Sequence, residues 1–213
     1  MGRWTIVETI AKDLLDIKAV KLSPQAPFTW ASGIKSPIYC DNRLTISYPA
    51  IRKAIAKGIA ALIKEKWPQA EVIAGTTTAG IPHAAWIAAE LDLPMVYVRS
   101  KPKDHGRGKQ IEGVLPAGAK TILIDDLIST GGSVLKAVAA ARNEGADVIG
   151  VAGIFSYQLA AATENFAKEK LEFVTLTNYG ELLDAAIKAD YVSADQRSVL
   201  EQWRQDPAHW TGA

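Results

Sequence analysis

Two adjacent carboxylates, Asp125 and Asp126, are the residues of this chain whose type and position most directly suggest chemistry. They follow an apolar run at 121–124 and precede a turn rich in glycine and hydroxyl groups. Because carboxylates repel a phosphate, a phosphate site alone does not explain them. They do suit a ligand that also carries a vicinal diol or a magnesium ion, since carboxylates accept hydrogen bonds from hydroxyls and hard cations prefer oxygen ligands.

The turn after the carboxylates has the composition of a phosphate cradle. Its glycines let the main chain approach closely, and its successive backbone N–H groups can point at one anion. A helix is expected to begin at Val134. The dipole of this helix and its unpaired N–H groups would add to the attraction for the anion. A charged turn with a hydroxyl helix cap would explain either half of the motif, but not both together. The cradle consists of Leu127, Ile128, Ser129, Thr130, Gly131, Gly132 and Ser133.

A second glycine-flanked loop, at 75–80, also lies between an expected strand and an expected helix. Its three threonines, Thr76, Thr77 and Thr78, offer small hydrogen-bond donors to an anion. By itself this signal is weak, because many strand–helix loops have the same composition.

Positive charge is concentrated at 99–109, in a chain whose formal net charge is only +1. A charge run is usually solvated surface. This one contains glycines and follows a strand, so it can act as a lid over a ligand. Its cations would stabilise the negative charge that develops on a departing pyrophosphate. The candidate groups are Arg99, Lys101, Lys103 and His105.

The elements that must position these loops alternate between strands and helices from about residue 70 onward. Strands are expected at 72–74, 94–98, 121–124, 148–155 and 173–176. The alternation predicts a mostly parallel α/β sheet whose ligands lie beyond the carboxyl ends of the strands. Earlier in the chain, helices are expected at 5–20 and 49–66, with short β-like pieces at 28–30 and 38–40. A last amphipathic helix is expected at 193–203, packed on the core.

Composition narrows the class of protein. The chain has 213 residues, 48% hydrophobic and 22% charged, which fits one globular domain. The near-neutral charge disfavours a nucleic-acid-binding surface, and neither a membrane-length apolar run nor a signal peptide is present. Cys40 is the only cysteine, so an intrachain disulfide is excluded. We expect Cys40 to be a small buried hydrophobe and the protein to be cytoplasmic.

The segment 122–133 closely resembles the phosphoribosyl-diphosphate signature of type I phosphoribosyltransferases: an apolar strand, Asp/Glu, Asp, two apolar residues, Ser/Thr, any residue, two glycines and Ser/Thr. The resemblance implies that Asp125 and Asp126 face the ribose, that the cradle holds the 5-phosphate, and that 75–80 is the pyrophosphate loop. It also implies one α/β domain over 1–213. About 1–45 would contribute a small base-binding hood, and about 70–180 the ribose-phosphate-binding core.

A different segment indicates the acceptor base. Residues 28–39 resemble the Phe-x-x-x-Ser-Gly-x-x-Ser-Pro-x-Tyr segment of orotate phosphoribosyltransferases. Lys35 suits an anionic pyrimidine carboxylate, and Phe28 can stack on a ring. The basic segment resembles that family's catalytic loop, Arg-x-x-x-Lys-x-His-Gly, through Arg99, Lys103 and His105.

Two positions depart from the family pattern. Ser100 stands where some members have a lysine after the lid arginine, and Lys101 is the candidate to supply that charge. The segment 156–158, Ser-Tyr-Gln, stands where some members have an arginine that contacts the base. Orotate recognition on that side is then expected from Ser129, Lys35, Tyr157 and backbone groups.

The resemblance implies a magnesium-dependent transfer of the 5-phosphoribosyl group from phosphoribosyl pyrophosphate (PRPP) to orotate, in pyrimidine (UMP) biosynthesis. The products are orotidine 5-phosphate and pyrophosphate. Mg2+ is expected to be bound mainly through the substrate, with Asp125 and Asp126 as candidate protein ligands. The expected catalytic residues are Lys103, His105, Asp125 and Asp126.

The resemblance further implies a homodimer whose basic lid reaches into the neighbour's site, with no nucleic-acid or membrane partner. Two alternatives stay open. One is transfer to a purine, against which Lys35 argues, and the other is a regulator of the same fold that senses ribose phosphates and binds nucleic acid. The formal net charge of +1 disfavours that regulator.

Overall fold

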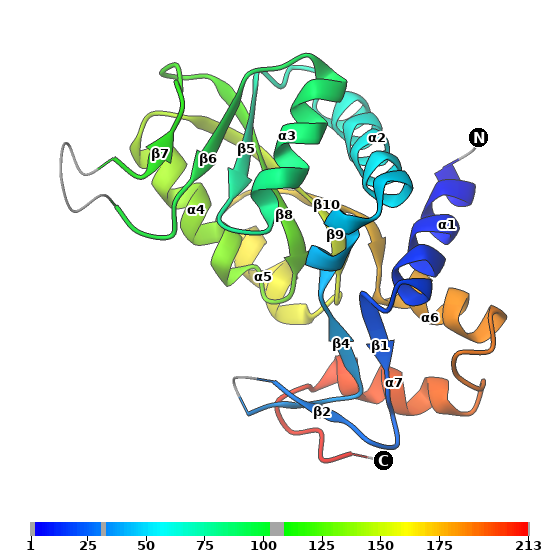
Figure 1. The fold of residues 1–213 in the computed structure, drawn as a ribbon. Helices are drawn as coiled ribbons and strands as arrows, with labels where there is room; N and C mark the ends of the chain where they lie inside the picture. The colour runs from blue at the N-terminus through cyan, green and yellow to red at the C-terminus, as the bar shows by residue number, and fades with distance from the viewer. Residues whose placement is uncertain (1–2, 31–32, 103–108, 213) are drawn as a thin grey trace.

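A six-stranded sheet lies at the centre of the computed structural model, which describes residues 3–30, 33–102 and 109–212, with residues 3–8 as backbone only. The strand order is β10-β9-β8-β5-β6-β7, and all neighbours are parallel except β6 and β7 (Figure 1). The predicted mostly parallel α/β sheet is therefore confirmed. The strands are β5 (Val72–Thr76), β6 (Met95–Val98), β7 (Ile111–Glu112), β8 (Lys120–Ile128), β9 (Asp147–Ser156) and β10 (Phe173–Asn178).

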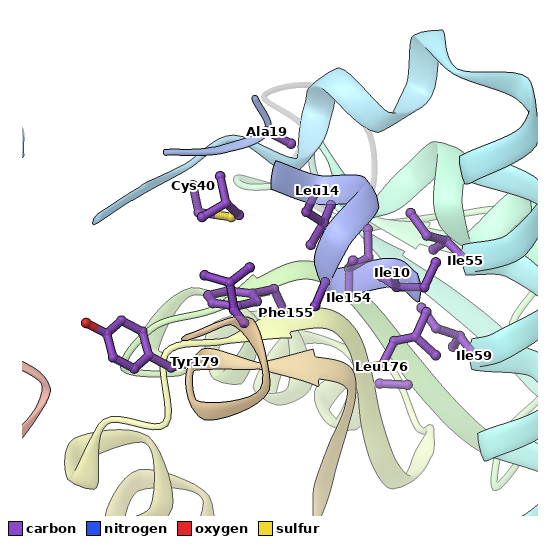
Figure 2. Packing of buried hydrophobic residues seen from close by; sticks show 14 of the residues in the cluster. Ile10, Leu14, Ala19, Cys40, Ile55, Ile59, Ile154, Phe155, Leu176 and Tyr179 are labelled. Carbon is purple, nitrogen blue, oxygen red and sulfur yellow. The ribbon is translucent and has the colours of Figure 1, made fainter. Parts of the chain in front are cut away.

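Helices cover both faces of the sheet. On one face lie α1 (Arg3–Asp16), α2 (Pro49–Lys66) and α3 (Gly80–Leu91), and their apolar side chains form one core cluster with the sheet. Figure 2 shows part of this cluster, where Ile10, Ile55 and Ile59 face Ile154 and Leu176. On the other face lie α4 (Gly132–Asn143) and α5 (Ala160–Lys168), which form a second cluster. A further helix, α6 (Tyr179–Lys188), joins the first cluster beside α1.

The element bounds agree with the sequence prediction in some places and correct it in others. Helix α2 has the predicted bounds, with proline at its first turn. The opening helix ends at Asp16 rather than at residue 20, because Lys18 takes a positive φ of 58° and Val20 begins a strand. The helix after the cradle begins at Gly132, two residues earlier than predicted.

Strand β8 is the most consequential correction. It was predicted to end at 124 but continues to Ile128, so both carboxylates lie on the strand and not in the following turn. The continuation is possible because β9 extends beside it, pairing Asp125 with Gly153 and Leu127 with Phe155. The main chain of this segment is therefore fixed by a sheet ladder.

A small hood of short elements adjoins the sheet. Its parts are the β1–β4 pair (Val20–Leu22, Ile38–Cys40), the β2–β3 hairpin (Phe28–Thr29, Lys35–Ser36), the 3₁₀ helix η1 (Asn42–Ser47) and α7 (Gln196–Gln205). Figure 1 shows α7, near the C-terminus, lying beside the N-terminal strands. The predicted packing of the last helix on the core is confirmed, since Leu200 and Trp203 are fully buried. Cys40 is buried and free, as expected.

Buried polar groups join the hood to the sheet. Asn42 is fully buried, and its side-chain amide donates to the main-chain oxygen of Asp126 at 2.6 Å. The Thr45 hydroxyl donates to the Asn42 carbonyl at 2.6 Å, and its oxygen lies 3.4 Å from Nε2 of His83 on α3. His83 is 1% exposed and burial lowers its pKa to about 4. The junction therefore holds a neutral imidazole. None of the helices within the described residues is long and apolar enough to cross a bilayer.

This neutral histidine predicts a specific pH dependence of stability. An unfolded histidine has a pKa near 6.5, so the unfolded chain takes up a proton that the folded chain refuses until about pH 4. The His83 contribution to the free energy of unfolding is fully present above about pH 6.5 and is lost as the pH falls below that value. Between pH 7.5 and pH 5 the His83 contribution to the free energy of unfolding should fall by about 2 kcal/mol.

Urea unfolding of the wild type and of His83→Gln at the two pH values measures this loss. The carboxylate contributions are common to both chains, so the difference isolates His83. An equal loss of stability in the two proteins would show that position 83 does not titrate as described.

Candidate functional site

The candidate site lies where the carboxyl ends of β5 and β8 meet. This is the switch point of the sheet, because the chain continues from β5 to β6 on one side and reaches β8 on the other. Open α/β sheets bind ligands at such points. The last residue of β5, Thr76, is buried, and its hydroxyl lies 2.8 Å from Oδ1 of Asp125 and 3.1 Å from the carbonyl oxygen of Ile124.

The two carboxylates are held in an environment that disfavours their charge. Burial raises the pKa of Asp125. Burial and then the neighbouring charge of Asp125 raise the pKa of Asp126 to about 7. The Asp126 N–H donates to Oδ1 of Asp125 at 3.0 Å, and Asn42 holds the Asp126 carbonyl. A cation or a pair of hydroxyl donors placed here would relieve the repulsion, so the donor set fits a ribose diol and a hard metal ion.

The cradle that follows β8 is open to a ligand. Gly131 has φ 78°, a conformation that other residues rarely adopt, and a Cβ on it would lie 2.7 Å from Cε2 of Phe166. Only glycine therefore fits this position. Asn165 supports the turn from behind by donating to the Thr130 carbonyl at 3.0 Å. Thr130, Gly132 and Ser133 are exposed, and Gly132 and Ser133 are the first two residues of α4.

The threonine hydroxyls at 76–78 were expected to be donors to an anion, but two of them contact the protein instead. The hydroxyls of Thr76 and Thr77 contact protein acceptors, Asp125 and the Val98 carbonyl respectively, so they hold the loop in place. Thr78 is exposed. Gly80 closes the loop tightly, since a Cβ on it would lie 2.3 Å from the Ile124 carbonyl oxygen and 2.6 Å from Oγ1 of Thr76.

The basic segment is anchored at both of its ends. Arg99 exchanges main-chain and side-chain hydrogen bonds with Gln110, and its guanidinium lies 3.8 Å from Glu112. The Glu144 carboxylate at the end of α4 accepts from the N–H groups of Gln110 and of Ile111, at 2.6 and 3.2 Å. Lys101 is exposed. Lys103 and His105 lie outside the described residues.

The base-binding candidates lie in the hood and beside β9. Lys35 is exposed on β3, and Phe28 pairs with Tyr39 at a ring-centroid distance of 5.8 Å. Tyr157 is 3% exposed, and its ring packs against Trp30 and Phe155. Burial raises the pKa of the Tyr157 phenol. The structure therefore makes Tyr157 a buried support beneath the hood rather than an exposed contact.

Sequence reasoning missed two groups that organise the site. Asn42 lies just beyond the recognised segment 28–39 and shows its importance only through its contact with β8. Glu144 is an ordinary charged residue in the sequence, and its role depends on the close approach of α4 to the lid. No metal-binding cluster of three or more His, Cys, Asp or Glu is found in the parts of the chain described.

Comparison with known proteins places this arrangement in a family. The phosphoribosyl transferase domain model matches residues 45–182. The orotate phosphoribosyltransferase of Enterococcus faecalis is 62% identical over 96% of this chain and 98% of that protein. The protein of the same name from Lactiplantibacillus plantarum is 62% identical over 96% and 97%.

A solved structure gives the same answer for the fold. The crystal structure of orotate phosphoribosyltransferase from Aeropyrum pernix has a TM-score of 0.73 against this chain, with 25% identity, over 86% of this chain and 99% of that one. The relatives match nearly the whole length and share the name of one activity. This chain belongs to the orotate phosphoribosyltransferase family.

Proposed function

We propose that this protein transfers the 5-phosphoribosyl group from PRPP to orotate, in the cytoplasmic synthesis of pyrimidine nucleotides. The observation that carries the proposal is the juxtaposition, at the end of β8, of the Asp125–Asp126 pair with the glycine turn that opens α4. The name shared by relatives 53–62% identical to the chain supports orotate, and not a purine, as the acceptor.

Asp125 and Asp126 accept hydrogen bonds from the ribose hydroxyls in this proposal. The main-chain N–H groups of the cradle, with the hydroxyls of Ser129, Thr130 and Ser133, hold the 5-phosphate at the positive end of the α4 dipole. The ladder with β9 and the Asn42 contact fix the main chain of the carboxylates. The ribose is therefore held at two points by one continuous segment, which orients its C1.

Magnesium fits the same segment. Asp125 and Asp126 would hold Mg2+ together with the oxygens of PRPP, because adjacent carboxylates with raised pKa values favour a nearby cation. When bound, the ion would neutralise part of the negative charge of the pyrophosphate. Thr78 and the main chain of 77–80 form the adjoining pyrophosphate loop.

The lid completes the site above the leaving group. Arg99, Lys101, Lys103 and His105 approach the pyrophosphate from a segment whose ends are fixed by Gln110 and Glu144. As the bond between C1 and the pyrophosphate oxygen breaks, its electron pair leaves with that oxygen. Cations at this place stabilise the developing charge more than the ground state. His105 is the candidate proton donor to the departing oxygen.

Orotate is recognised from the hood. Its ring nitrogen loses its proton to solvent and forms the new bond to C1, while Lys35 pairs with its carboxylate and Phe28 lies against its ring. Ser129 adds a hydrogen bond from the cradle side. Tyr157 acts from beneath by supporting Trp30. The protein supplies position and charge, and no covalent intermediate is required.

The proposed reaction is tested by following the ultraviolet absorbance of orotate. With PRPP and Mg2+ the protein should consume orotate at a rate proportional to enzyme concentration, and chelation of the metal should stop the reaction. Adenine and hypoxanthine, supplied in place of orotate, should release no pyrophosphate. Turnover of a purine without turnover of orotate would contradict the proposed acceptor while leaving the phosphoribosyl chemistry intact.

We also propose that the active unit is a homodimer in which each lid serves the neighbouring site. Exposed apolar side chains near η1 support an interface, since Leu44 and Tyr48 are 41% and 43% exposed. Mixing chains tests the arrangement. Lys103→Ala homodimers should bind PRPP but turn over slowly, and Asp125→Asn homodimers should be inactive. Random pairing of the two should restore about a quarter of the wild-type activity, because half the dimers contain one intact composite site.

The mixture is prepared by co-expression with two different tags, and the mixed dimer is isolated through both. The isolated mixed dimer, with one intact site of two, should have about half the wild-type activity, and it is compared with each parental homodimer. A mixed dimer no more active than its parents would show that the lid acts on the site of its own chain.

A further inference from the structure

The C-terminal helix α7 contacts the hairpin that carries Lys35. Trp203 on α7 is fully buried, and its indole N–H donates to the main-chain oxygen of Lys35 at 3.0 Å. The two residues are 168 positions apart in the chain. A hydrogen bond between residues so far apart in the chain depends on the tertiary fold and not on the helix alone.

The hairpin needs an external support. It consists of two residue pairs, Phe28 with Ser36 and Thr29 with Lys35, closed by hydrogen bonds between Trp30 and residues 33 and 34. A two-stranded hairpin is at best marginally stable in water by itself. Both strands of such a hairpin are edge strands, whose main-chain groups that do not pair across the hairpin need partners elsewhere. The Trp203 indole is the donor for the carbonyl of Lys35.

The surrounding aromatic rings make this support rigid. The ring of Trp30 lies 5.3 Å from that of Tyr157 and 5.6 Å from that of Trp203, measured between centroids. The ring of Tyr179 also packs on Trp203, with 5.7 Å between centroids, and its hydroxyl donates to the Leu200 carbonyl at 2.8 Å. The indole therefore cannot rotate without disturbing its neighbours, and its N–H has a fixed direction.

We propose that Trp203 is a positioning residue for the acceptor base: its indole N–H fixes the main chain of Lys35 so that the lysine ammonium meets the carboxylate of the base. The inference rests on the proposed function, in which Lys35 binds orotate. It assigns to α7 a part in base recognition, in addition to its burial in the core. The ring of Trp203 stabilises the aromatic cluster, and its N–H positions the main chain of Lys35.

Trp203→Phe separates these two contributions. It keeps an aromatic ring in the cluster and removes the donor to Lys35. Loss of one neutral hydrogen bond should raise the KM for orotate about fivefold, with the KM for PRPP and the value of kcat little changed. Replacement of Trp203 by β-(3-benzothienyl)alanine, which keeps the indole shape without the N–H, should give the same result if the phenylalanine variant folds poorly.

Tyr179→Phe is the matched control. It removes one hydrogen bond from the same helix in the same cluster, but the lost acceptor is Leu200 and not Lys35. It should lower the unfolding temperature without raising the KM for orotate. A rise equal to that of Trp203→Phe would show that α7 acts only by holding the hood together, and would overturn the inference.

A double-mutant cycle with Lys35→Ala distinguishes this inference from the function on which it rests. Trp203→Phe should change the KM for orotate by less than about twofold in the Lys35→Ala background, because the lysine is then absent. An undiminished effect in that background would overturn the positioning role. If Lys35→Ala itself leaves the KM for orotate unchanged, the proposed role of Lys35 fails, and the inference fails with it.

Discussion

The burial of two adjacent carboxylates at the end of β8 is the constraint on which the rest of the site depends. Asp125 is buried and Asp126 half-buried; burial raises the pKa of both carboxyls, and the charge of Asp125 raises that of Asp126 further. The Thr76 hydroxyl and the Asp126 N–H both reach Oδ1 of Asp125. These contacts satisfy only part of the hydrogen-bonding capacity of the two carboxylates. A ligand that brings hydroxyl donors and a divalent cation supplies the rest, so binding relieves a repulsion that folding leaves in place.

The surrounding loops share one feature, which is a hydrogen bond that fixes the base of each. Thr76 ties the loop at 75–80 to β8, Asn42 ties the hood to the same strand, and Glu144 ties the basic segment to α4. Trp203 fixes the β2–β3 hairpin in the same way from the C-terminal helix. Each tie is a buried or half-buried hydrogen bond to main-chain or carboxylate atoms. Rigid supports of this kind hold the residues of a site in a fixed geometry.

The sequence predicted the mostly parallel sheet and five of its strands because strand–helix alternation is a local pattern, whereas the two-residue strand β7 was not predicted. Helix α2 could be bounded because prolines mark both of its ends. The extent of β8 could not, since aspartates are rare in strands and only the partner strand β9 and the buried Thr76 make them tolerable there. The phosphate cradle was predicted from its glycines, of which Gly131 has the required positive φ. The roles of Asn42 and Trp203 depend on contacts 84 and 168 residues away, which no local pattern reveals.

Thermal unfolding of the wild type and of Asp126→Asn at pH 8, with and without PRPP and Mg2+, tests the central claim most directly. The pKa of Asp126 is raised to about 7, so at pH 8 the folded wild type carries the whole penalty of its charge, on the order of a few kcal/mol. We predict that the ligand-free Asp126→Asn protein unfolds at a higher temperature than the wild type, and that PRPP with Mg2+ stabilises only the wild type substantially. A variant that is less stable without ligand, yet gains as much stability from PRPP and Mg2+ as the wild type, would contradict the account.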